Sequence, residues 1–271
     1  MFQSFLVRWL AVLRPPCCFA YSRRFDLVNF LSTLYITVSS AGLVGGGSIP
    51  KPGEVSLAHR GVLFLDEFPE FTRGVLEVLR QPLEDRLVTI GSARAVYTFP
   101  SDFLLAAAMN PCPCGYHGAE TEANSCRCSP LQILKYRSRL SGPLLDRIDL
   151  HVEVPRLSYA NLKEQGQSLS SAEMLHMVMS AGERQLIRYR GLEIHSNKEL
   201  GGKLLHQIGK LTKEGEAILS SSFEKLGLSA RAYDRILRLA RTIADLEDSD
   251  AIEPQHVAEA IQYRNLDKKS V

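Results

Sequence analysis

The chain has 271 residues, with 32 Lys and Arg against 30 Asp and Glu, and 23% of its residues are charged. This length is enough for one large or two modest domains with a real hydrophobic core, and the composition excludes disordered and collagen-like proteins. A formal net charge of +2 gives no overall attraction to nucleic acids or membranes, so any basic surface must be local. Six cysteines are too few for a disulfide scaffold in a chain of this length, and four of them cluster.

Residues 1–36 differ in composition from the rest of the chain. The first 50 residues contain no Lys, no Glu and one acidic residue, Asp26. No stretch of about 20 apolar residues is available for a membrane-spanning helix, and no signal-peptide cleavage site follows a clean apolar run. We interpret this part as unrelated to the remainder of the protein and expect no membrane partner. The apolar runs are interrupted by Arg8, Arg14, Arg23 and Arg24.

Residues 37–156 have the pattern of an α/β core. The glycine- and proline-rich residues 45–53 indicate a loop. The apolar run 61–65 ends at Asp66 and Glu67, which is typical of a buried parallel strand with a site at its carboxyl end. Further along, the pattern predicts a helix over 73–84 that Pro82 ends or kinks, a β-hairpin over 87–99, a buried strand over 103–108, a helix near 130–140 and a strand over 150–154.

The remaining residues, 157–271, predict an all-α domain. Their apolar residues recur at helical spacing, and Gly201–Gly202 marks a break between helices. The clearest helix is capped by Ser229. Its predicted apolar face holds Tyr233, Ile236, Leu237, Ala240 and Ala244.

Two carboxylates and one amide form the strongest candidate site. Asp66 and Glu67 end one apolar strand, and Asn110 ends the next. Because the carboxyl ends of parallel strands meet at one edge of the sheet, we expect these side chains to converge. In many NTPases, the Asp at this position holds Mg²⁺ through water and the Glu polarises the attacking water. The alternative is a buried strand that leads into a charged turn.

Two arginines have both a structural and a functional interpretation. Arg147 stands between carboxylates in the stretch LLDRID. It either forms a local ion pair with Asp146 or Asp149 or reaches the nucleotide of a neighbouring subunit as an arginine finger. Arg231 lies at the start of the helix capped by Ser229, where it is either a solvated charge or helps to hold a phosphate.

A loop over 111–129 carries four cysteines in two C-x-C pairs. Four thiolates suit tetrahedral Zn²⁺, and His117 is a substitute candidate for one of them. The alternative is four reduced thiols in a cytosolic loop. The candidate zinc ligands are Cys112, Cys114, Cys126 and Cys128.

Four long motifs resemble those of one family. They read GLVGGGSIPKPGEVSLAHRGVLFLDEFPEF, AAAMNPCPCGYHG with CRCSP, YRSRLSGPLLDRIDLHVEVPR, and LSARAYDRILRLARTIADLE. Together they are similar to the magnesium-chelatase-like AAA+ ATPases, and within these to the bacterial competence-associated subfamily, which resembles hexameric DNA helicases that drive branch migration. The resemblance covers residues 38–268. It implies an α/β fold in which a partial AAA+ P-loop NTPase module is followed by an all-α lid.

The resemblance implies a role for each residue of the candidate site. ATP and Mg²⁺ are the implied cofactors, with Asp66 and Glu67 as the Walker B pair and Asn110 as sensor 1. Arg147 is implied to act in trans on the nucleotide of a neighbour in a homo-hexameric ring. Arg231 is implied to be sensor 2 in the lid.

The same resemblance implies a DNA motor. The loop 45–53 and the hairpin 87–99 are implied to project toward a central pore, where Lys51 and Arg94 are our candidate contacts to DNA phosphates. For each of them, a plain solvated charge is the alternative. We expect a cytoplasmic protein. The alternative functions are an ATPase subunit that drives magnesium insertion into a porphyrin, and a pseudo-ATPase or inert fragment that joins a ring through Arg147.

The chain departs from the family at the phosphate-binding site. An ATPase of this kind needs a P-loop, G-x-x-x-x-G-K-[ST], whose N–H groups and lysine hold the phosphates. No such string occurs in the sequence, and Pro50 stands where the glycine run 45–47 would need its second glycine. We therefore expect the C-terminal part of a longer ATPase, with residues 1–36 from an altered reading frame or a non-homologous start. Without the P-loop strand, the strand over 150–154 loses its neighbour, and the α/β part is expected to be less stable than the lid.

Overall fold

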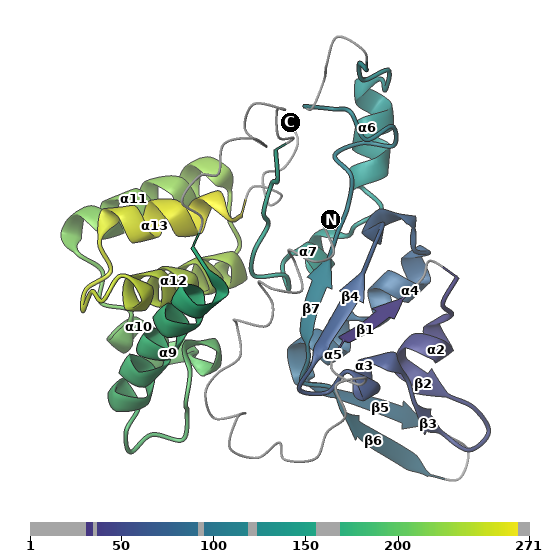
Figure 1. Ribbon diagram of the computed structural model, residues 1–271, viewed down its shortest axis with the longest axis horizontal. Helices are drawn as coiled ribbons and strands as arrows, with labels where there is room; N and C mark the ends of the chain where they lie inside the picture. The colour runs from purple at the N-terminus through teal and green to yellow at the C-terminus, as the bar shows by residue number, and fades with distance from the viewer. Residues whose placement is uncertain (1–30, 35–36, 92–94, 119–123, 156–168, 265–271) are drawn as a thin grey trace. The chain divides into compact units, whose positions relative to one another are not determined.

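The computed structural model describes residues 31–34, 37–91, 95–118, 124–155 and 169–264. These residues form two compact units: one contains the described residues up to Ile148, and the other contains those from Asp149 onward. Helices and strands are both present (Figure 1), so the mixed α/β fold class predicted from the sequence is confirmed.

A small parallel sheet lies at the centre of the first unit. Its strands are ordered β1 (Leu31–Leu34), β4 (Val62–Leu65) and β7 (Leu104–Ala107). All four residues of β4 are buried, because this strand has a hydrogen-bonded neighbour on each side. The predicted buried strand over 61–65 is therefore confirmed, whereas β1 lies in a region for which the sequence predicts no element.

Strand β7 is less buried than the sequence predicts. Leu104 is 38% exposed, and of the four residues of β7 only Ala106 is buried. Among the described residues, β7 pairs with β4 alone and forms an edge of the sheet. The apolar run over 103–108 thus predicts the strand correctly but does not reveal its edge position.

Short helices pack against this sheet. The helix predicted over 73–84 is present but divided at Leu79, since Pro82 lacks an N–H and its ring crowds the carbonyl of Val78, four residues earlier. The core contains Leu43, Val55, Leu63, Leu65, Phe68, Leu76 and Leu79. The helices of the unit are α2 (Ser40–Val44), α3 (Glu54–Leu57), η3 (Phe68–Glu70), α4 (Arg73–Val78), α5 (Arg80–Asp85), α6 (Pro130–Arg137) and α7 (Gly142–Leu145).

Two antiparallel hairpins complete the first unit. Strands β5 (Leu87–Gly91) and β6 (Val96–Pro100) form the hairpin predicted over 87–99. The loop predicted over 45–53 contains a second, two-residue pair formed by β2 (Gly45–Gly46) and β3 (Lys51–Pro52). Gly45 has φ +99°, and a Cβ added there would lie 2.3 Å from the carbonyl oxygen of Lys51. The close approach of the two strands therefore requires glycine at this position.

The strand predicted over 150–154 is wrong: the structure assigns no strand to these described residues. Val152 and Val154 are each 60% exposed. The N–H of His151 donates instead to the carbonyl oxygen of Tyr263 at 2.7 Å. The alternating apolar pattern is that of a strand, but a strand forms only where a neighbour satisfies its backbone groups.

The second unit is built on helices. Helix α12 contacts α9, α10 and α13, and its predicted apolar face is confirmed in the core. The Ser229 hydroxyl accepts from the N–H of Ala232 at 3.1 Å, as the predicted cap requires. An isolated bridge joins Leu211 and Ile252. The elements are α9 (Ser171–Arg188), η4 (Asn197–Glu199), α10 (Gly202–Ile208), α11 (Lys213–Leu226), α12 (Ala230–Leu246) and α13 (Pro254–Gln262).

A buried ion cluster fixes α9 and η4 to α12. The fully buried carboxylate of Asp245 accepts from Arg188 at 2.8 Å and from Asn197 at 2.9 Å, and it lies 3.1 Å from Arg241. Burial lowers the pKa of the Arg241 guanidinium, and Asp245 opposes this shift. Each buried charge of the cluster therefore has an oppositely charged or hydrogen-bonding partner, without which its burial would be costly.

We expect the two units to differ in their resistance to proteases. In limited proteolysis of the whole chain, the helical unit should survive as a fragment while the α/β unit is degraded, because the small sheet has an exposed edge strand and the helical unit has a closed apolar core. Mass spectrometry of the fragments measures this. An α/β fragment that outlasts the helical one contradicts the prediction.

Candidate functional site

The site predicted from the sequence lies at the carboxyl ends of β4 and β7. These strands pair in parallel with Leu65 opposite Ala107. The N–H of Ala108 donates to the Leu65 carbonyl oxygen at 2.9 Å, and the N–H of Phe68 donates to the Ala108 carbonyl oxygen at 2.9 Å. The backbone hydrogen bonds therefore continue past both strand ends and hold the turn that contains Asp66 and Glu67 against Ala108, two residues before Asn110.

The turn after β4 presents two carboxylates to solvent. Asp66 and Glu67 are both exposed, whereas Phe68 is buried in the core and anchors the turn. The backbone N–H of Glu67 donates to Oδ1 of Asp66 at 2.9 Å. Glu67 has φ +50°, a left-handed conformation that is uncommon for a residue with a Cβ. Asn110 follows β7 and is also exposed.

Helix α6 contributes residues that the sequence analysis did not single out. Tyr136 is buried, and its pKa is raised by burial and by the nearby Glu70, while a hydrogen bond with the backbone of Asn110 opposes the shift. Arg139, just beyond α6, bonds to Glu70 at 2.5 Å and to the carbonyl oxygen of Pro69 at 3.2 Å. The helix itself was predicted, but no local pattern indicates that it contacts the turn after β4.

The four cysteines of the loop come together in space, as the sequence suggested. We call Cys112, Cys114, Cys126 and Cys128 the cysteine cluster. Their sulfur atoms all lie within 4.8 Å of one another, and each cysteine is free of disulfides. The pKa of Cys114 is lowered to about 6, first by a hydrogen bond from the backbone of Tyr116 and then by one from Cys112. This shift favours the thiolate form of Cys114, which is the form of cysteine that binds metals.

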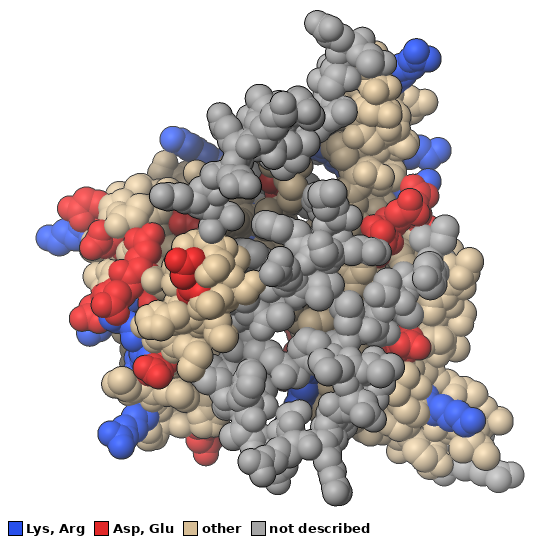
Figure 2. Space-filling model, viewed as in Figure 1, with Lys and Arg blue, Asp and Glu red and all other residues tan. Residues whose placement is uncertain are grey.

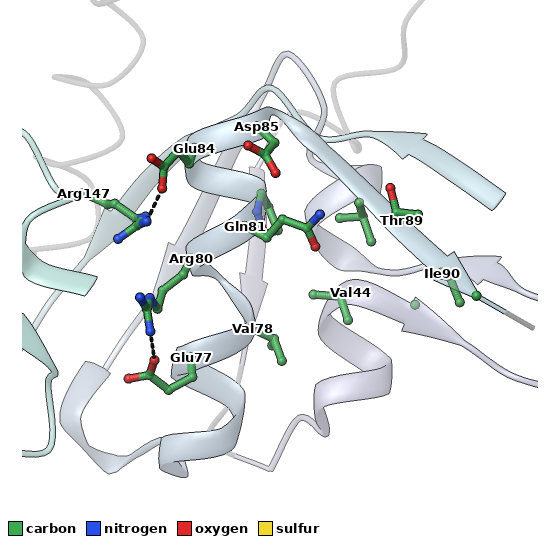
Figure 3. A pocket seen from close by; sticks show the side chains of 14 residues that line it. Val44, Glu77, Val78, Arg80, Gln81, Glu84, Asp85, Thr89, Ile90 and Arg147 are labelled. Atoms are coloured by element: carbon green, nitrogen blue, oxygen red, sulfur yellow. Dashed lines mark hydrogen bonds and ion pairs between the residues drawn. The ribbon is translucent and has the colours of Figure 1, made fainter. Parts of the chain in front are cut away.

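Arg147 lies beside a cavity of about 710 Å³ in the same unit (Figure 3). Its side chain is 9% exposed, forms an ion pair with Glu84 of α5 and donates to the carbonyl oxygen of Pro143 at 2.6 Å. A second pair, between Arg80 and Glu77 at 2.8 Å, lines the same cavity. The sequence suggested only neighbours as ion-pair partners of Arg147, so its pairing with Glu84 is a finding of the structure.

The other predicted site residues fall into different parts of the chain. Lys51 is exposed at the tip of the β2–β3 pair, and Arg94 lies outside the described residues. Arg231 is exposed in the first turn of α12, in the helical unit. Its approach to a nucleotide stays a prediction. Asp149, the other suggested partner of Arg147, pairs with Arg235 of α12.

The carboxylates at the end of β4 fit a magnesium–nucleotide site. Mg²⁺ prefers oxygen ligands and keeps several of its water molecules. The exposed carboxylates of Asp66 and Glu67 are acceptors for such waters, and Asn110 offers an exposed neutral amide after the neighbouring strand. The arrangement can therefore orient metal-bound water and an attacking water at one edge of the sheet.

Two known family models match the chain. A family model described as magnesium chelatase, subunit ChlI, matches residues 27–162. A second, described as magnesium chelatase, subunit ChlI C-terminal, matches residues 168–264. The chain belongs to the magnesium chelatase ChlI family. The ChlI match contains the carboxylates after β4, Asn110, the cysteine cluster and Arg147, and the C-terminal match contains Arg231.

Several relatives are known by name. The uncharacterized protein YifB of Escherichia coli is 46% identical over 86% of this chain, and the competence protein ComM of Haemophilus influenzae is 46% identical over 85% of it. More distantly, the maternal DNA replication licensing factor mcm6 of Xenopus tropicalis is 24% identical over 82% of the chain. The chain spans 44% of the length of YifB and of ComM, and 26% of the length of mcm6.

None of the helices in the described part of this ChlI-family chain is both long and apolar enough to cross a membrane.

Proposed function

We propose that the chain is part of an ATP-dependent AAA+ motor that acts on DNA. In this proposal, the residues at the carboxyl edge of its parallel sheet catalyse the hydrolysis of ATP. The observation that carries the proposal is the placement of Asp66 and Glu67 after β4 and of Asn110 after β7, two paired parallel strands that end at the same edge of the sheet. Membership of the ChlI family supports an ATPase. The similarity to a competence protein and to a replication licensing factor supports DNA as the substrate. We keep the expected cytoplasmic location as part of this proposal.

Each residue of the edge has a separate task in the proposed reaction. When bound, Mg–ATP supplies the phosphoryl group that is transferred to water. Asp66 holds the hydration shell of the metal through its exposed carboxylate. Glu67 orients and polarises the attacking water. Asn110, which follows the neighbouring strand, donates a hydrogen bond to that water from its amide N–H. The 271 residues contain no P-loop, so the proposed site requires a phosphate-binding segment in addition to these residues.

We further propose that Arg147 and Arg231 complete the site in a homo-hexameric ring. Arg147 acts on the nucleotide of a neighbouring subunit, where a guanidinium stabilises the charge that develops on the phosphates. To do so it must exchange its ion pair with Glu84 for a phosphate. Arg231, in the first turn of α12, holds a phosphate from the helical unit.

The proposed contacts to DNA are local. On the helical unit, acidic and basic side chains are interspersed on the face drawn in Figure 2, and the net charge of the chain is only +2. We propose that Lys51 and Arg94, on the loops 45–53 and 87–99, contact DNA phosphates. Such contacts weaken steeply with added salt, because phosphate binding releases counterions.

Binding and hydrolysis of Mg–ATP test the proposal once the chain is supplied with the phosphate-binding segment that the site requires. We expect detectable binding in calorimetry. We expect Glu67→Gln to leave this binding unchanged and to lower hydrolysis about 10²- to 10⁴-fold, the contribution typical of a positioned general base. Glu214→Gln is the matched control, since Glu214 is an exposed glutamate of α11 in the other unit, and it should change neither quantity.

The outcomes separate the alternative functions. Absence of Mg–ATP binding contradicts an ATPase role for this chain and favours a pseudo-ATPase or inert fragment. Binding with hydrolysis that is insensitive to Glu67→Gln contradicts the assigned role of Glu67. Unwinding of branched DNA by a longer relative such as ComM supports the motor. Metallation of a porphyrin by that relative, without unwinding, supports the chelatase instead.

A further inference from the structure

We propose that the cysteine cluster binds one Zn²⁺ ion and that this ion fastens the loop after β7 to the start of helix α6. In tetrahedral zinc–thiolate sites the Zn–S bond is about 2.3 Å, so the sulfur atoms lie about 3.8 Å apart. The sulfur of Cys112 lies 3.3 Å from that of Cys114 and 3.8 Å from that of Cys126, and Cys114 and Cys126 are 3.6 Å apart. The side chains are thus already arranged around one ion.

The sulfur distances also exclude disulfide bonds among these thiols in the structure. A disulfide bond is about 2.05 Å long, far shorter than the closest separation of 3.3 Å. A set of four sulfurs within 4.8 Å encloses a single ion, and four thiolates in a tetrahedron select zinc or iron. His117, the substitute candidate of the sequence analysis, is not needed, because the cluster already supplies four ligands.

The position of the cluster indicates what the ion would hold together. Cys128 directly precedes Ser129, which caps α6 through a reciprocal bond with Gln132. Cys112 is fully buried and lies two residues after Asn110. A zinc ion bound by both Cys112 and Cys128 would therefore connect the segment that follows β7 with the first turn of α6. This is the helix whose Tyr136 contacts the backbone of Asn110.

The turn between Cys112 and Cys114 adds a second link to the edge of the sheet. The N–H of Gly115 donates to the carbonyl oxygen of Cys112 at 3.0 Å. Gly115 has φ +81°, and a Cβ added there would lie 4.0 Å from the carboxamide of Asn110. The turn that the ion would hold therefore lies close to the Asn110 side chain. The role of Asn110 rests on the proposed function, whereas the binding of zinc does not.

Metal analysis of the purified whole chain tests the site. We expect about one equivalent of zinc, and X-ray absorption should show four sulfur neighbours at about 2.3 Å. Cys112→Ser with Cys126→Ser should lose the zinc. Cys17→Ser with Cys18→Ser, which changes the only other cysteines of the chain, should retain it. Less than about half an equivalent in the unchanged chain, iron in place of zinc, or a nitrogen or oxygen neighbour overturns the proposal.

Hydrogen exchange keeps the proposal testable if the cysteine variants fail to fold. Removal of metal from the unchanged chain with a chelator should raise the exchange of the α6 amides at least about tenfold, because the helix start loses its anchor. The amides of α12, in the other unit, are the internal control and should keep their protection. Equal exchange of α6 with and without metal contradicts the anchoring role. Since neither measurement involves ATP, a failure here leaves the proposed ATPase untouched, and the reverse also holds.

Discussion

Replacing Asp245 with asparagine is expected to lower the free energy of unfolding of the helical unit by about 3 to 5 kcal/mol. The Asp245 side chain is fully buried, and the Arg241 side chain beside it is 1% exposed. The substitution removes the only negative charge that the described contacts give to Arg241, and it weakens the bonds from Arg188 and Asn197. A guanidinium cannot lose its proton to relieve this, so the charge stays buried or the helices separate.

Asp248→Asn is the matched control. Asp248 also pairs with an arginine, Arg184, but its side chain is 79% exposed, so the loss should be at most about 1 kcal/mol. Hydrogen exchange of the α12 amides under native conditions reports the free energy of opening of this unit alone. Equal effects of the two substitutions would show that burial does not determine the strength of this ion cluster.

Replacing Phe68 with alanine is expected to cost the α/β unit about 3 to 5 kcal/mol. Phe68 is 2% exposed, packs in the core of that unit and ties the turn after β4 to β7 through its N–H. Loss of the ring leaves a cavity under the turn that holds Asp66 and Glu67. We therefore expect lower stability and a looser geometry of the candidate site together.

Two companion variants make the result interpretable. Phe68→Leu keeps most of the apolar volume and should cost less than about 1.5 kcal/mol. Leu57→Ala removes a side chain that is 55% exposed in the same unit and should change stability by no more than about 0.5 kcal/mol. Pulse proteolysis in urea, with the fragments of each unit followed separately, gives the unfolding midpoints. A Phe68→Ala midpoint equal to that of Leu57→Ala contradicts the anchoring role of Phe68.

Local sequence patterns predicted the elements that form through local interactions or through complete burial. Strand β4 is a short apolar run with both neighbours in place, and α12 has its cap and its apolar face within one segment. Strand β1 was not predicted, because its pairing with β4 depends on residues about thirty positions away. The strand over 150–154 was predicted wrongly for the converse reason, since its pattern is that of a strand but its backbone bonds to Tyr263.

The candidate site shows the same division. The position of Asp66, Glu67 and Asn110 after the carboxyl ends of two paired parallel strands could be predicted from the sequence. The grouping of the cysteines was visible in their spacing. The pairing of Arg147 with Glu84, and the approach of Tyr136 to Asn110, link residues far apart in sequence. Such contacts depend on how helices pack, for which no single segment carries a signal.

The left-handed backbone at Glu67 places stability and the proposed activity in conflict. A residue with a Cβ pays about 1 to 2 kcal/mol to adopt this conformation, and glycine or asparagine adopts it more easily. The fold by itself would therefore gain from losing the glutamate, although this is the side chain assigned to the attacking water. A selection for heat resistance alone should drift toward glycine at this position, whereas a selection for hydrolysis should hold the glutamate there.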